Sequence, residues 1–324
     1  MCCLYGMIDY GAQLSMKKKN KMLNVLSKEC EERGTHATGI AFNWGGQLRI
    51  NKKALPAHVA KLIPMGSPTV IMGHTRFTTK GSEKDNYNNH PFMGNFDDSR
   101  FALAHNGVLY NDDYLRKTEK LPDTKIKTDS YVAVQLIEKH NALSFDSLKD
   151  MAEKVEGSFT FTAMDEEDNL FIVKGDNPMC IYKFPDKGFY LYASTKDILD
   201  KACKKLHLNF LRHEHINLDE GDIICIDRHG AITKSFFNFA RSYDFFSGYD
   251  FFRGFGYRDY RTKKKNKADD NVSLLKEYAA MYGITEDEID YLIDSSYTEE
   301  EIEELISYPF LLRECIDYAY CDDY

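Results

Sequence analysis

The stretch MCCLYGMI, residues 1–8, places two cysteines directly before an uninterrupted apolar run. A run of this length predicts a buried strand over residues 3–8. If the initiator Met1 is removed, Cys2 becomes the first residue and carries both a thiol and an α-amine. The ordinary pKa of an α-amine is ~7.7 to 8.0, so this group can accept the thiol proton near neutral pH. The alternative is that Cys2 and Cys3 are small packing residues at the start of a strand.

Composition places the chain among ordinary globular proteins. Its 324 residues are 43% hydrophobic and 29% charged, which is enough to bury a full-sized core. The formal net charge of -9 argues against binding of nucleic acid by the chain as a whole. The cysteine spacing matches no zinc site or redox couple, and no run approaches the ~18 apolar residues of a membrane helix. We therefore expect a cytoplasmic enzyme without a membrane segment.

Outward from the first strand, short apolar runs alternate with turn signals as far as about residue 228. This pattern predicts an α+β domain rich in strands, with two sheets sandwiched by helices. Strands are expected at residues 3–8, 39–42, 47–51, 70–74, 101–104, 158–164, 170–174, 188–193 and 223–227, and helices at 19–32, 130–139, 145–155 and 196–205.

The character of the chain changes past residue 233. Residues 235–260 are rich in Phe, Tyr and Gly, and a basic cluster follows. The remainder is acidic, and its two capping boxes, Thr285 to Glu288 and Thr298 to Glu301, each predict the start of a helix. We expect three segments: a catalytic domain over 1–235, a linker over 236–268 and an acidic helical tail over 269–324.

A long polar loop, GHTRFTTKGSEKDNYNNHPF at residues 73–92, follows a predicted buried strand. Arg76 could pair bidentately with the α-carboxylate of an amino acid, and the hydroxyl of Thr79 could add a neutral hydrogen bond. His90 lies near the end of the same loop. The alternative is an arginine that forms a surface ion pair in a mobile loop.

Two further motifs have both a structural and a catalytic interpretation. The Asn106-Gly107 pair in LAHNGVLYN, residues 103–111, is a common hairpin turn signal. The same pair could form an oxyanion hole from the Asn106 amide and the Gly107 N–H. Asp129 in KTDSYVAVQLIE, residues 127–138, would ordinarily cap a helix. Its carboxylate could also hold the α-ammonium of glutamine while Arg76 holds the α-carboxylate, which would place the amide for attack by Cys2.

Taken in order, CCLYG, RGTHATGI, HTRFTTKG with NNHPF, HNGVLYN and TDS resemble the serial motifs of class II glutamine amidotransferases. The resemblance covers about residues 1–235, and the overall length is similar to that of the stand-alone members. It implies the four-layer αββα N-terminal-nucleophile (Ntn) hydrolase fold of two antiparallel sheets, followed here by a small helical appendage. It also implies that Cys2 is the nucleophile, that Asn106 and Gly107 form the oxyanion hole, and that Arg76, Thr79 and Asp129 hold glutamine. His90 would order the glutamine loop.

The implied reaction hydrolyses the side-chain amide of glutamine through a γ-glutamyl thioester on Cys2, without a metal or organic cofactor. Two departures leave the subfamily open: Cys3 stands where the family usually has Gly, and Lys80 where many sugar-amidating members have His.

Residues 236–324 resemble no synthase domain, so the ammonia acceptor is expected to be a separate subunit that docks at the C-terminal region. The alternatives are a stand-alone amidohydrolase acting on a γ-glutamyl or other amide, and an inactive Ntn-like binding protein. Stacking of the aromatic segment on nucleic acid is disfavoured by its Asp residues and by the lack of a defined binding module.

Overall fold

The computed structural model describes residues 2–239, 276, 279, 284–294 and 302. The chain divides into two compact units, Met1–Gly248 and Tyr249–Tyr324. Within the described residues, no helix is both long enough and apolar enough to cross a membrane.

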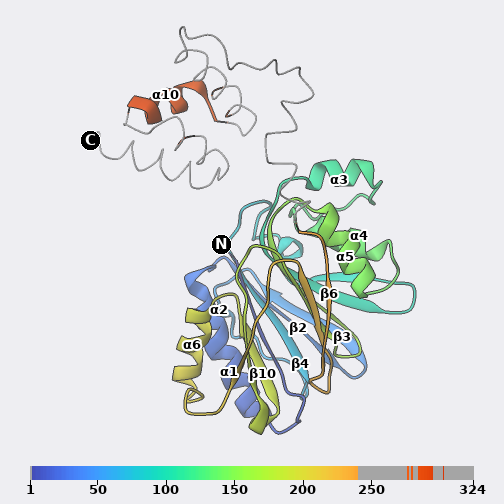
Figure 1. Ribbon diagram of the computed structural model, residues 1–324, viewed down its shortest axis with the longest axis vertical. Coiled ribbons are helices and arrows are strands. Elements are labelled where there is room, and N and C mark those ends of the chain that lie inside the picture. The colour runs from blue at the N-terminus through green and yellow to red at the C-terminus, as the bar shows by residue number, and fades with distance from the viewer. Residues whose placement is uncertain (1, 240–275, 277–278, 280–283, 295–301, 303–324) are drawn as a thin grey trace, which may run out of the picture. The chain divides into compact units, whose positions relative to one another are not determined.

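The first unit is built on two antiparallel sheets (Figure 1). The order β11-β9-β10-β1-β4-β2-β3 places β1 at the centre of the seven-stranded sheet, and the six-stranded sheet has the order β13-β12-β8-β7-β6-β5. The seven-stranded sheet comprises β1 (Cys3–Ile8), β2 (Ala37–Trp44), β3 (Gln47–Lys53), β4 (Val70–Arg76), β9 (Cys180–Phe184), β10 (Phe189–Ala193) and β11 (Glu214–Ile216). The six-stranded sheet comprises β5 (Phe92–Asn95), β6 (Arg100–Leu109), β7 (Gly157–Asp165), β8 (Leu170–Lys174), β12 (Asp222–Ile226) and β13 (Ile232–Phe236).

Helices cover the outer face of each sheet, which gives four layers (Figure 1). On the seven-stranded sheet lie α1 (Met16–Glu29) and α6 (Lys196–Lys205), which share one apolar cluster with β1 and β10. On the six-stranded sheet lie α4 (Tyr131–Glu138) and α5 (Phe145–Lys154), which pack against β6 and β7. The predicted αββα sandwich is therefore confirmed. The shorter helices are α2 (Ala57–Ala60), α3 (Asp112–Thr118), η1 (Cys30–Glu32), η2 (Asn86–Asn88) and η3 (Pro185–Lys187).

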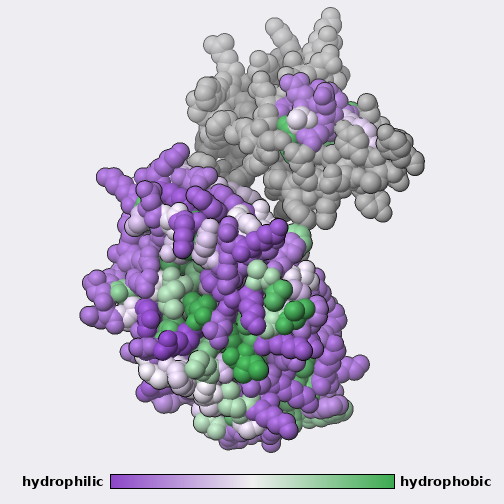
Figure 2. Space-filling model, turned by 180° about the vertical axis from the view of Figure 1, so that it is seen from behind, coloured by the Kyte–Doolittle hydropathy of each residue, from purple (hydrophilic) through white to green (hydrophobic). Residues whose placement is uncertain are grey.

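The position of β1 explains its uninterrupted apolar sequence. Successive side chains of a strand point to opposite faces, and both faces of β1 are covered. Cys3, Tyr5 and Met7 pack toward the helices, whereas Leu4 and Ile8 pack into the core between the sheets. All six residues of the strand are buried. Around this core, hydrophilic residues cover most of the face drawn in Figure 2, with some hydrophobic side chains grouped among them.

The predicted strands are present with adjusted ends, but four strands were not predicted: β5, β9, β11 and β13. All four have five residues or fewer, and β11 has only three, so their periodicity is too short to detect in the sequence. The Asn106-Gly107 pair is not a turn, because both residues lie inside β6, which runs on to Leu109. The apolar core of the first unit also includes Phe237, beyond β13.

In the second unit, the described residues include helix α10 (Glu286–Asp294). The predicted capping box is present: the Glu288 amide donates to Thr285 Oγ1, and the Thr285 amide donates to Glu288 Oε2. The second predicted box, Thr298 to Glu301, lies outside the described residues. Buried apolar side chains of this unit are Ala279, Ile284, Ile289, Leu292 and Ile302.

Candidate active site

Cys2 lies immediately before the central strand β1 and is only 9% exposed. Its thiol donates to the Phe77 carbonyl across 3.5 Å, and its own carbonyl accepts from Arg33 Nε at 3.0 Å. Burial raises the pKa of the Cys2 thiol, although nearby Arg76 opposes the shift. The thiol is therefore protonated near neutral pH, and its use as a nucleophile requires a base.

Arg76 is the last residue of β4 and is buried at 2% exposure. Its guanidinium donates to Asn89 Oδ1 at 2.7 Å and to the carbonyls of Lys80 and Gly81 at 2.7 and 3.0 Å. A guanidinium has five N–H groups, so these three bonds leave donors for a ligand. Burial lowers the pKa of Arg76, while Cys2 and Asp129 raise it, which indicates that the three groups lie close together.

Asp129 is a buried carboxylate and not the helix cap that its position suggested. The N-terminal cap of α4 is Ser130, and its side chain makes no capping bond. Asp129 Oδ2 instead accepts from the Leu109 amide at 2.7 Å, which ties the start of α4 to the end of β6. Burial raises the pKa of Asp129, and the hydrogen bond from Leu109 opposes this shift.

Asn106 is fully buried, yet neither its side-chain nitrogen nor its side-chain oxygen has a hydrogen-bond partner. Buried amides are nearly always paired, so this side chain indicates a ligand position. Gly107 follows with φ 144°, and a Cβ there would lie 1.8 Å from the Ser158 carbonyl oxygen, so only glycine fits. The Asn106 carbonyl accepts from Asn177 Nδ2 at 3.1 Å.

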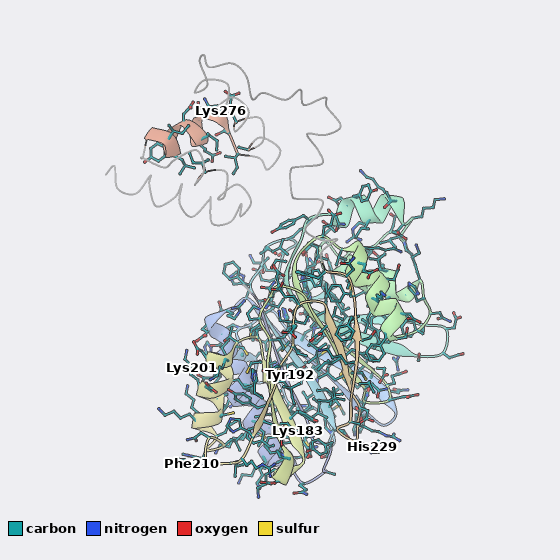
Figure 3. All side chains as sticks on the ribbon, in the orientation of Figure 1. Lys183, Tyr192, Lys201, Phe210, His229 and Lys276 are labelled. Atoms are coloured by element: carbon teal, nitrogen blue, oxygen red, sulfur yellow. The ribbon has the colours of Figure 1, made fainter. Side chains whose placement is uncertain are left out.

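Strand register places Asn106 near Cys2. Leu4 of β1 pairs with His74 of β4, and His74 Nε2 donates to the His105 carbonyl of β6 at 2.9 Å. His105 of the six-stranded sheet therefore lies opposite the beginning of β1, which follows Cys2 directly. Asn106 is the next residue of β6, so it lies at the same end. Tyr192, labelled near the middle of the first unit in Figure 3, is buried and pairs with Gly6 of β1.

His90 lies close to two other buried histidines, His74 and His105. Its ring lies 4.3 Å from that of His74 and 4.4 Å from that of Phe92, and neither of its nitrogens has a partner. Burial lowers the pKa of His74 and of His105 to about 3 and that of His90 well below its usual value. All three rings are therefore neutral near pH 7. Thr79, by contrast, is exposed on the loop after Arg76.

Several supporting residues were missed by sequence reasoning. Asn88 accepts from the Lys127 amide and, through its carbonyl, from Thr128 Oγ1, which joins the loop to the Asp129 turn. Lys52 donates to the carbonyls of Asn89 and Pro91 at 2.6 and 3.2 Å, and burial lowers its pKa to about 8. Asn88 belongs to the NNHPF motif, so its sequence context could have indicated a role. No pattern around Lys52 indicates that it contacts this loop.

The structure thus brings Cys2, Arg76, Asp129 and Asn106 to one end of β1. His90, near the end of the loop that follows Arg76, packs against His74 and Phe92. Two antiparallel sheets covered by helices, with a buried cysteine immediately before the central strand of one sheet, are the arrangement of the Ntn-hydrolase class of fold.

Comparisons with known proteins agree with this class. Residues 74–201 match the family described as a glutamine amidotransferase domain. The glutamine–fructose-6-phosphate aminotransferase of Sulfurisphaera tokodaii is 31% identical over 237 residues, which are 68% of this chain and 39% of that protein. That of Lactococcus lactis is 34% identical over 195 residues, covering 56% of this chain and 30% of that protein.

Among solved structures, the glutamine phosphoribosylpyrophosphate amidotransferase of B. subtilis superposes with a TM-score of 0.56 at 19% identity. The match covers 73% of this chain and 49% of that one. The chain therefore contains a class II glutamine amidotransferase domain, as its serial motifs predicted. It spans less than half the length of these relatives.

Proposed function

We propose that this protein hydrolyses the side-chain amide of glutamine, with Cys2 as the nucleophile once Met1 has been removed. The observation that carries the proposal is the buried Asn106 amide, which has no partner and lies at the Cys2 end of β1. A donor in that position can stabilise the oxyanion that forms on the amide oxygen.

In the proposed reaction, the α-amine of Cys2 takes the thiol proton and the sulfur attacks the side-chain carbonyl carbon of glutamine. The resulting oxyanion accepts hydrogen bonds from Asn106 Nδ2 and the Gly107 amide. The protonated amine then donates to the leaving nitrogen, the C–N bond breaks, and ammonia departs from a γ-glutamyl thioester. Water attacks the thioester with the amine as base, which releases glutamate and restores the thiol.

The buried charges support a zwitterionic amino acid as the ligand. Arg76 retains N–H donors for the α-carboxylate, and Asp129 supplies a carboxylate for the α-ammonium. Thr79 would add a hydrogen bond if its loop closed over the ligand, and His90 would support that loop from below. Binding would also offset the cost of burying both charges.

The test is intact-mass analysis of the full chain combined with an assay of glutamate release from glutamine. We expect the active protein to lack Met1, Cys2→Ala to release no glutamate, and hydroxylamine to trap γ-glutamyl hydroxamate. Cys3→Ala is the matched control and should stay active, because its nitrogen is in a peptide bond. Full activity in Cys2→Ala, or in protein that retains Met1, would refute the proposal.

We further propose that the ammonia passes to a separate acceptor subunit that docks at the C-terminal region, over residues 236–324, in the cytoplasm. The relatives are named as aminotransferases, which supports an acceptor for the ammonia, and residues 236–324 resemble no synthase domain. Co-purification of a synthase that amidates its substrate from glutamine only in this protein's presence would support the assignment. Faster hydrolysis of other γ-glutamyl amides than of glutamine, without any acceptor, would favour a stand-alone amidohydrolase.

A further inference from the structure

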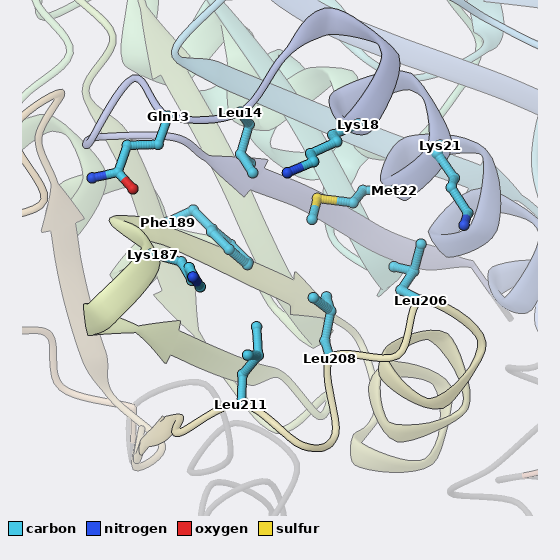
Figure 4. Close-up of a pocket in the computed structure, with 10 residues that line it drawn as sticks. All are labelled: Gln13, Leu14, Lys18, Lys21, Met22, Lys187, Phe189, Leu206, Leu208 and Leu211. Atoms are coloured by element: carbon cyan, nitrogen blue, oxygen red, sulfur yellow. The ribbon is translucent and has the colours of Figure 1, made fainter.

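A pocket lies at the far end of β1 from Cys2, bordered by the start of α1, by η3 with β10, and by the segment after α6 (Figure 4). Its volume is about 370 Å³, within the range of small-molecule sites. Gln13 and Leu14 of the pocket come shortly after Ile8, the last residue of β1, whereas Cys2 comes just before its first residue. The six residues of β1, about 20 Å of strand, therefore separate the pocket from the nucleophile. The glutamine site therefore does not account for it.

The floor of this pocket is apolar. Met22, Phe189 and Leu208 line it and are 6%, 1% and 7% exposed, so the surrounding fold holds them in place. They come from three separate segments, a helix, a strand and a connecting segment, and converge on one hollow. An apolar tail seated there would be removed from water without rearrangement of the core.

The rim is cationic. Lys18, Lys21 and Lys187 line the pocket together with Gln13, and no carboxylate is among the lining residues. Within the described part of the chain, these three lysines make no ion pair, whereas Lys201 and Lys205 on neighbouring α6 pair with Glu32 and Glu29. The rim therefore carries three ammonium groups and no carboxylate, although the chain as a whole has a net charge of -9.

We propose that this pocket binds a small anionic amphiphile, whose apolar chain fills the floor and whose carboxylate or phosphate head is held by Lys18, Lys21 and Lys187. Lysine ammonium groups act as point charges and do not require a planar partner. We therefore expect the pocket to select its ligand by the apolar tail and by the negative charge of the head group. The proposal is independent of the glutamine chemistry.

The test is calorimetric titration of the full-length protein with decanoate and with decyl phosphate below their micelle-forming concentrations. We expect saturable one-site binding of at least one anion, and at least tenfold weaker binding of decanol, acetate and decyltrimethylammonium. The combined variant Lys18→Gln, Lys21→Gln, Lys187→Gln should weaken binding at least tenfold. The matched control changes three exposed lysines outside the pocket, Lys17→Gln, Lys28→Gln and Lys204→Gln, and should bind normally.

Equal binding of decanol, or equal losses in the two lysine sets, would overturn the proposal, as would the absence of saturable binding. Phe210, which is 82% exposed near the end of α6 (Figure 3), allows a second experiment that distinguishes a small ligand from a membrane surface. If anionic vesicles capture the protein, and if Phe210→Ser abolishes both this capture and decanoate binding, the surface is a membrane contact and the proposal fails.

Discussion

At the scale of single residues, the site combines groups that are costly to bury with groups that have no partner inside the protein. Asn106 is the sharpest case, because a fully buried amide without hydrogen bonds contributes nothing favourable to folding. Its retention is explained if its partner is the substrate oxygen. Removal of such a side chain should lower the activity without lowering the free energy of unfolding.

We predict that Asn106→Ala lowers kcat for glutamate release by roughly 10²–10³ while the free energy of unfolding stays unchanged or rises. Steady-state kinetics and urea denaturation measure the two effects. Asn177→Ala is the contrasting variant: it removes hydrogen bonds to Ser158 Oγ and to the Asn106 carbonyl, so it should lose stability. A stability loss in Asn106→Ala as large as in Asn177→Ala would contradict this interpretation.

The buried histidines predict a pH dependence of stability. The folded-state pKa of His74 and of His105 is about 3, whereas an unfolded histidine titrates at ~6.5. Between these values the unfolded chain binds protons that the folded chain does not. The free energy of unfolding should therefore fall as pH drops below about 6.5, approaching roughly 1.4 kcal/mol per pH unit for each histidine.

Urea denaturation at pH values between 7.5 and 5.5 tests this slope. His105→Gln should reduce it, whereas His229→Gln, which changes an exposed histidine, should leave it unchanged. A stability that does not change with pH across this window would show that the buried rings are not the source of the effect.

At the scale of elements, strand β6 carries the oxyanion pair in its interior, and its pairing with β7 leaves no room beside Gly107. The pairing sets Gly107 opposite Phe159, next to the Ser158 carbonyl that a Cβ would meet. The backbone must therefore move to accept any side chain. Such a movement would also displace the Gly107 amide.

We predict that Gly107→Ala lowers the free energy of unfolding by about 2–4 kcal/mol and abolishes glutamate release. Gly45→Ala is the matched control, since Gly45 also has a positive φ, 62°, but a Cβ there would meet nothing within 4 Å. That control should lose only about 1 kcal/mol, from backbone strain, and keep its activity. Equal losses in the two variants would mean that the clash with Ser158 has no energetic consequence.

At the scale of the whole molecule, the chain divides at Gly248, and each of the three apolar clusters of the first unit is formed by residues up to Phe239. A domain with its own core can fold alone. We predict that a chain ending at Gly248 unfolds at the same urea concentration as the full protein. Its glutamate release should agree within about twofold.

The same shortened chain tests the role assigned to the C-terminal region. It should no longer co-purify with an acceptor subunit that the full chain captures. Aggregation of the shortened chain, or a lower denaturation midpoint, would show that the first unit depends on the residues removed.

The sequence by itself determined the fold class, because a buried central strand needs an apolar run and outer helices need an apolar face, and both patterns are local. It also indicated Cys2, Arg76 and Asp129 through their motifs and order. It did not reveal that Asn106 and Gly107 lie within a strand, because an Asn-Gly pair favours a turn unless strand pairing overrides it. The alternative interpretation of Asp129 as a helix cap was wrong, because Ser130 occupies the cap position of α4.

Only the tertiary structure decided which polar groups have partners. Asp129 bonds the end of β6, Lys52 holds a loop 37 residues away, and the Asn106 amide has no partner. The pocket with its unpaired lysines likewise depends on three segments meeting. The physical reason is that burial and hydrogen bonding are set by residues distant along the chain, whereas propensity and periodicity act between neighbours.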